Sequence, residues 1–84
     1  MPQSTMMQML LQLQTDLNNL TIRCIQANSC VTAILDLYND KVTPYTAIHD
    51  RCAKWGEALD AMSDALENFQ NNAAKLGEYL DAQG

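Results

Sequence analysis

The chain has 84 residues, of which ten are acidic and five basic, and its formal net charge at pH 7 is −5. A chain of this length forms at most one domain, and it buries a poor core unless a staple or a partner helps. The five basic residues form no cluster. This argues against binding to nucleic acid or to anionic membrane surfaces, because both need concentrated positive charge.

The sequence also bears on the cellular compartment. No apolar run approaches the length of a membrane span. The N-terminus lacks the basic region of a secretory signal, and Gln8, Gln12 and Gln14 interrupt its apolar residues. Three cysteines in no recognisable framework suit a reducing compartment. We therefore expect a cytoplasmic protein, and we leave open export by a route that needs no cleaved signal.

Apolar residues recur in the first half of the chain at alternating gaps of four and three. This first stripe consists of Met6, Leu10, Leu13, Leu17, Leu20, Cys24, Ala27, Val31, Ile34 and Tyr38. The alternation is the heptad pattern of a packed helix. It predicts a helix over about residues 4–39.

The middle of the chain contains residues that end one helix and begin another. Asn39 and Asp40 favour leaving a helix, and Pro44 cannot continue one because it lacks an amide hydrogen. We expect a turn at about residues 39–43, with Thr43 as the N-cap of the next helix and Pro44 at its first position.

The second half repeats the alternation, which predicts a second helix over about residues 44–82. The second stripe consists of Ile48, Cys52, Trp55, Leu59, Met62, Leu66, Phe69, Ala73, Leu76 and Leu80. A short connection makes the two helices antiparallel neighbours, and it pairs positions whose numbers add to about 83. We therefore predict a single all-α domain, residues 1–84, folded as a two-helix, coiled-coil-like hairpin. Its predicted core consists of Leu13, Leu17, Leu20, Trp55, Leu59, Leu66 and Phe69.

The first helix has more apolar surface than one neighbouring helix can cover. Residues 1–15 and 24–35 contain no charged side chain. The second helix, in contrast, has a row of polar residues seven positions apart, which begins with Asp50, Glu57 and Asp64. A helix face in contact with water is usually charged. We expect the first helix to be covered on more than one side, either by a second copy in a four-helix bundle or by another helical protein.

Two groups of residues are candidates for partner binding. The first, on the first helix, consists of Met7, Met9, Leu11, Ile22 and Ile25. Methionine adapts to irregular surfaces, which suits a partner-binding end. The second group is Gly56 and Gly77, which belong to a row of little bulk where a partner helix can pack closely. Glycines tolerated on a solvated face are the alternative.

The sequence predicts no catalytic residue, no metal and no cofactor, so we expect a protein that is not an enzyme. His49 and Cys52 lie one turn apart, and the predicted pairing adds Cys30, but zinc needs four ligands and a fourth is not evident. A Cys–His nucleophile would need a shaped pocket, which a packed hairpin does not offer.

The outline of two long antiparallel helices resembles three groups of proteins in architecture only. They are small secreted proteins with a Trp-x-Gly motif at the turn, needle subunits and chaperones of type III secretion systems, and helical inhibitors made by bacteriophages. Here Trp55-Gly56 is misplaced and misspaced for that motif. We therefore expect an interaction module, such as an adaptor, small chaperone or inhibitor. A self-assembling structural or secretion-system component is one alternative. A small-molecule binder lined by Asn18, Asn19, Gln26 and Asn28 is the other.

Overall fold

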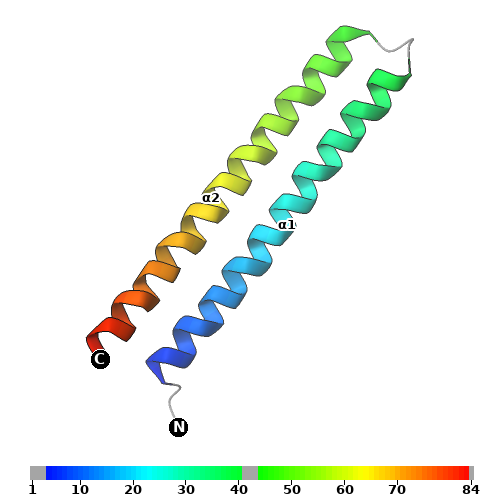
Figure 1. Cartoon of the computed structure of the whole chain (residues 1–84). Coiled ribbons are helices and arrows are strands. Elements are labelled where there is room, and N and C mark those ends of the chain that lie inside the picture. Colours follow the sequence, from blue (N-terminus) through cyan, green and yellow to red (C-terminus); the bar gives the residue numbers. More distant parts are fainter. Residues whose placement is uncertain (1–3, 41–43, 84) are drawn as a thin grey trace.

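The computed structural model describes residues 4–40 and 44–83, and it forms an antiparallel pair of α-helices (Figure 1). Helix α1 spans Thr5–Asn39 and helix α2 spans Tyr45–Gln83. Neither described range contains a strand. The all-α prediction is confirmed, and the helices are arranged as the predicted hairpin. The molecule is a rod that measures 62 × 22 × 15 Å.

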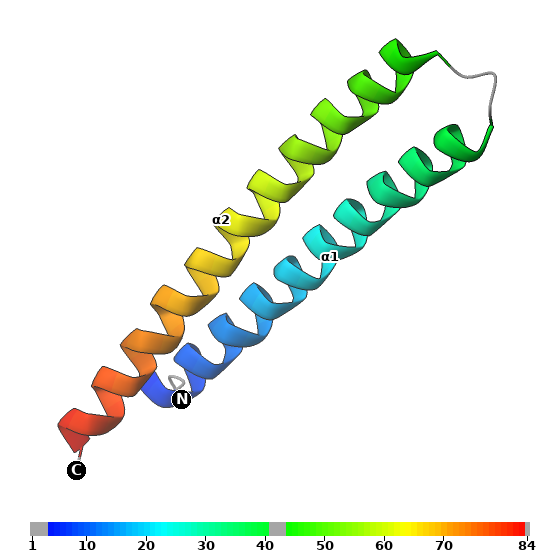
Figure 2. The ribbon, with the colours of Figure 1, turned by 45° about the horizontal axis from the view of Figure 1, so that its top comes forward.

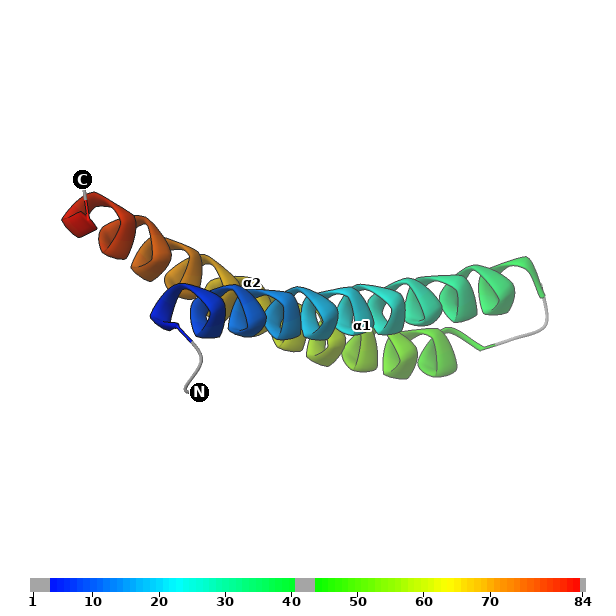
Figure 3. The same ribbon diagram turned by 90° about the horizontal axis from the view of Figure 1, so that it is seen from below.

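The two helices lie side by side along most of their length. Figures 1 and 2 show the start of α1 beside the end of α2 at one end of the rod, and the end of α1 near the start of α2 at the other. Seen from below, the helices cross each other rather than running parallel, as two helices with interlocking side chains do (Figure 3).

Local hydrogen bonds define the helix ends that the structure describes. The Ser4 hydroxyl accepts a hydrogen bond from the Met7 amide at 3.0 Å, which caps the start of α1. At the other end of α1, the Asp40 amide donates to the Asp36 carbonyl. The Pro44 carbonyl accepts from the Ala47 and Ile48 amides as α2 begins. Thr43, the predicted N-cap, lies outside the described residues.

Side chains seven positions apart form one row along each helix, and two rows of each helix are at least partly covered by the other. In α1 these contact rows are Met6, Leu13, Leu20, Ala27 and Ile34, and Met9, Asp16, Arg23, Cys30 and Leu37. In α2 they are Ile48, Trp55, Met62, Phe69 and Leu76, and Ala58, Ala65, Asn72 and Tyr79.

The prediction that both rows of each stripe face the neighbouring helix is wrong for one row of each helix. Half of each stripe lies in a contact row, but the other half lies one residue further along and is turned outward. Leu17 and Leu66, predicted as core, are 50% and 43% exposed, whereas their neighbours Asp16 and Ala65 are buried. The physical reason is that alanine lets the helices approach closely and Asp16 finds hydrogen-bond donors across the contact.

The other five predicted core residues are partly covered. Leu13, Leu20, Trp55 and Phe69 lie in contact rows, and Leu59 is partly buried beside them. No large side chain in the described ranges is fully buried, and the buried apolar residues are Ala27 and Ala65. Two helices meet along a single line, so each large side chain keeps one side in water.

The pairing of the helices also differs from the prediction. A sum of 83 would place residue 67 opposite Asp16, but Asp16 bonds to Asn68 and Asn72. The midpoint of these partners lies about one helical turn further along α2. The structure therefore shifts the pairing towards the C-terminal end of α2.

Enlarging a buried alanine should separate the helices. Ala65→Leu adds three carbon atoms at a buried position of the helix contact, and overpacking of this kind lowers the free energy of unfolding by about 1–3 kcal/mol. Ala74→Leu is the matched control, because Ala74 is exposed on the same helix. Chemical denaturation at one fixed protein concentration measures both. Equal stability of the two variants would contradict the close contact at Ala65.

Candidate interaction surfaces

A buried carboxylate is the best-defined polar feature of the helix contact. Asp16 is 4% exposed. Its Oδ1 accepts hydrogen bonds from Gln12 Nε2 at 2.8 Å and Asn68 Nδ2 at 3.1 Å, and its Oδ2 accepts one from Asn72 Nδ2 at 2.6 Å. We call these four residues the polar cluster. Two of its bonds join α1 to α2, so the cluster holds the helices in one alignment.

The polar cluster favours the charged form of Asp16. The hydrogen bond from Asn72, followed by that from Gln12, lowers the pKa of Asp16 from its ordinary value of 3.8. Desolvation by burial raises this pKa, and the bond from Asn68 lowers it further, so the net shift is downward. Asp16 is therefore a charged carboxylate at neutral pH. In this form both of its oxygens accept hydrogen bonds from α2.

Apolar periodicity did not predict the polar cluster, although the sequence contains a signal for it. Asp16 is the only acidic residue among the first 35, and it lies in a helix predicted to be covered. A covered carboxylate requires donors, and Asn68 and Asn72 are donors spaced to share one helix face.

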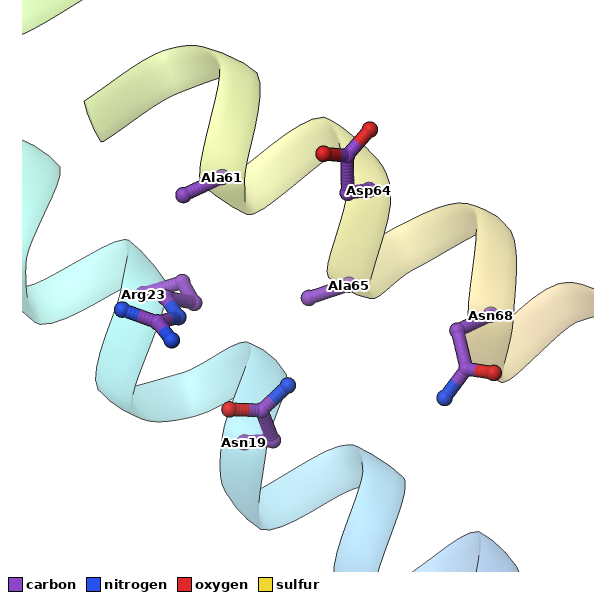
Figure 4. A pocket seen from close by; sticks show the side chains of 6 residues that line it. All are labelled: Asn19, Arg23, Ala61, Asp64, Ala65 and Asn68. Atoms are coloured by element: carbon purple, nitrogen blue, oxygen red, sulfur yellow. The ribbon is translucent and has the colours of Figure 1, made fainter. Parts of the chain in front are cut away.

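Next to the polar cluster, an open hollow of about 310 Å³ lies between the helices (Figure 4). Asn19 and Arg23 line it from α1, and Ala61, Asp64, Ala65 and Asn68 line it from α2. The hollow exists because the two alanines leave space opposite α1. Arg23 donates to Gln26 of its own helix at 3.1 Å.

The hollow does not unite the residues predicted to bind a small molecule. Asn19 lines it, whereas Asn18, Gln26 and Asn28 are exposed elsewhere on α1. Ligand sites for small molecules are usually enclosed and mostly apolar. This open, polar hollow has neither property.

Next to the contact rows, both helices carry an apolar row on the same side of the hairpin, and apart from the half-buried Val31 and Leu59 the members of these rows are exposed. The two rows are Leu10, Leu17, Cys24, Val31 and Tyr38 in α1, and Tyr45, Cys52, Leu59, Leu66, Ala73 and Leu80 in α2. Each follows a contact row by one residue. An antiparallel pair of helices has an approximate two-fold axis perpendicular to the plane that contains both helices. Rotation about this axis exchanges the apolar row of α1 with that of α2, so both rows face the same side of the hairpin.

This side of the hairpin carries no charged residue. Beyond the apolar rows lie two flanking rows, namely Met7, Gln14, Thr21, Asn28 and Leu35, and His49, Gly56, Ser63, Gln70 and Gly77. The contact rows that begin at Met6 and Ile48 also face this side. None of these six rows contains Asp, Glu, Lys or Arg. We call them the charge-free face. All charged residues in the described ranges belong to the remaining rows, as does the polar cluster.

The structure places the predicted partner-binding residues in three different locations. Met7, Gly56 and Gly77 belong to the flanking rows of the charge-free face, and a Cβ added at either glycine would meet nothing within 4 Å. Met9 lies in a contact row. Leu11, Ile22 and Ile25 lie on the opposite, outward side of α1, where they are 41%, 53% and 60% exposed. We call these three residues the outer strip.

The charges of α1 accentuate the apolar character of its outward side. Asp16 and Arg23 both lie in a contact row and face α2. From residue 5 to residue 35, every outward-facing row of α1 is therefore free of charge. A helix in contact with water normally keeps its charges outside, and α1 has the reverse arrangement.

The described residues contain no cluster of possible metal ligands. Within residues 4–40 and 44–83, no three His, Cys, Asp or Glu side chains come together as metal ligands would. His49 and Asp50 are both exposed, with Nδ1 and Oδ1 3.9 Å apart. The three cysteines are free thiols. Neither α1 nor α2 has an apolar stretch long enough to cross a bilayer.

Comparison with known proteins gave no match to a family model, to a curated protein or to a solved structure. Function is therefore inferred from the surface of the hairpin itself.

Removing the charge of Asp16 should change how stability depends on pH. Its pKa is lower in the folded chain than in the unfolded chain, so its contribution is present above the unfolded value and is lost as pH falls through the folded value. We expect Asp16→Asn to be less stable than the wild type at pH 7 and to lose less stability on acidification below pH 4. Asp60→Asn, an exposed change on α2, is the control. Urea denaturation from pH 2 to pH 7 measures the effect, and parallel curves for Asp16→Asn and the wild type would contradict it.

Proposed function

We propose that the protein is a non-enzymatic interaction module, such as an adaptor, small chaperone or inhibitor, that works inside a protein assembly. The observation that carries this proposal is the incomplete core: no large side chain in the described ranges is fully buried, while leucines and isoleucines are about half exposed. Burying one such side chain completely contributes about 1.5–3 kcal/mol, so contact with a partner supplies stability that a single hairpin lacks.

The outer strip supports α1 as the helix that contacts other proteins. Ile22 and Ile25 are three residues apart and Leu11 lies further along the same side of α1, which is the spacing with which a helix presents apolar side chains to a groove or to another helix. Since this side has no charge, binding would rest on apolar burial and shape rather than on electrostatic attraction. Another helical protein is the partner that fits these features best.

A self-assembling structural component is the second candidate. The charge-free face and the outer strip lie on different sides of the hairpin, so one copy can contact neighbours on both sides. An arrangement of this kind extends into an array when the contacts do not close on themselves. The two candidates differ in whether the mass of the purified protein reaches a plateau as concentration rises.

Dilution tests whether the hairpin needs a partner. We expect the purified chain either to assemble and lose helicity on dilution, or to be poorly helical alone, because its core is incomplete. Native mass spectrometry and far-UV circular dichroism over a concentration series measure both properties. A fully helical, compact single chain in dilute solution would contradict the proposed function.

Charge placed on the outer strip should prevent binding to other proteins. We expect Leu11→Glu and Ile25→Glu to lose a partner that the wild type retains on co-purification from its own cells, because burying an unpaired carboxylate is unfavourable. Asn71→Glu is the control, since Asn71 is exposed on α2, in the row of Asp64 and Glu78, outside both surfaces. Recovery of the same proteins with all four chains, quantified by mass spectrometry, would rule out the outer strip as the contact.

A further inference from the structure

We propose that the charge-free face binds the same face of a second copy of this chain, forming a two-fold symmetric four-helix bundle. This inference rests on the proposed function, because it identifies one partner of the interaction module. It leaves the outer strip uncovered on both copies, where another protein can bind.

The distribution of charge favours a second copy as the occupant of this face. Each chain carries a net charge of −5, so two copies repel each other wherever acidic residues meet. The six rows of the charge-free face contain no acid, and the described acidic residues lie on the other rows. Two copies joined through this face therefore keep their acidic residues on the outside of the bundle.

The chemistry of the face is also self-complementary. A two-fold interface places one surface against an identical surface, so each charged group would need an opposite charge at the symmetric position. A face without charges meets this requirement everywhere. It also offers no charged group by which a different partner could be selected in place of a second copy.

The size and shape of the face suit a stable dimer. The rod is 62 Å long and 22 Å wide, so this face exceeds the roughly 800 Å² that each partner contributes to a typical stable interface. Exposed leucines such as Leu17 and Leu66 alternate with small residues such as Ala73 and Gly77. Large side chains of one copy can therefore fit into spaces on the other.

The test compares two substitutions that differ in the side of α1 they occupy. Leu17 and Ile25 are 50% and 60% exposed in the hairpin, so a glutamate disturbs the single chain to a similar degree at either position. Leu17 belongs to the charge-free face and Ile25 to the outer strip. Leu66→Glu repeats the test from α2. Native mass spectrometry and sedimentation of each purified chain measure assembly.

We expect the wild type and Ile25→Glu to have twice the 9.4 kDa chain mass. Leu17→Glu and Leu66→Glu should weaken the dimer by at least about 100-fold, because each copy would bury an unpaired carboxylate. A dimer that survives both substitutions, or a mass that rises without a plateau, would overturn the inference. A poorly helical wild-type monomer would also overturn it while leaving the proposed function intact. A fully helical monomer would refute both.

The reactivity of Cys24 gives a second measurement of whether the charge-free face is covered. Its thiol is exposed in the single hairpin and lies in the same row as Leu17. In the wild-type dimer, alkylation of Cys24 should be at least about tenfold slower than in Leu17→Glu, because the second copy covers it. Peptide mass mapping separates Cys24 from Cys30 and Cys52. Equal rates in the two proteins would overturn the proposed dimer face.

Discussion

Two helices can touch along only one line, and in this protein alanines and a hydrogen-bonded aspartate occupy the centre of that line. Ala27 and Ala65 bring the helices together, and Asp16 is satisfied by donors from both helices. Large apolar side chains such as Leu17 and Leu66 are consequently displaced to one side of the contact. The hairpin is thus held in alignment by small and polar groups while much of its apolar surface remains open to a partner.

The polar cluster and the apolar rows have complementary effects. An apolar contact between two regular helices can shift by one turn with little loss of stability, because each leucine then packs against another leucine of the neighbouring helix. A carboxylate that needs donors at fixed positions does not tolerate such a shift, since its partners would then be lost. Asp16, Asn68 and Asn72 therefore supply alignment, and the apolar rows supply surface for association. A buried polar residue that specifies register has this effect in coiled coils.

Sequence periodicity was sufficient to predict the two helices, the position of the turn and the excess of apolar surface on the first helix. Of the two rows predicted to face the neighbouring helix, one is wrong in each helix. Periodicity locates the centre of an apolar sector, whereas the contact lies at the edge of that sector. The rows of Asp16 and Leu17 border the row of Leu13 and Leu20 on opposite sides, and only the residues of α2 decide which of the two rows meets that helix. Those residues, Asn68 and Asn72, lie more than 50 positions away in the chain. The outer strip was predicted as partner-binding because it is apolar, but its separation from the charge-free face requires the orientation of α1 around its own axis.

The start of α1 and the end of α2 lie at one end of the rod, and the end of α1 and the start of α2 lie at the other (Figure 1). A pair of such rods can therefore be joined head to head or head to tail. The first arrangement gathers the starts of both α1 helices and the ends of both α2 helices at one pole. The second places one start and one end at each pole, and the two poles are separated by a distance comparable to the 62 Å length of the rod. A protein fused beyond the start of α1 or the end of α2 would therefore be present twice at one end of a head-to-head pair. In a head-to-tail pair it would be present once at each end.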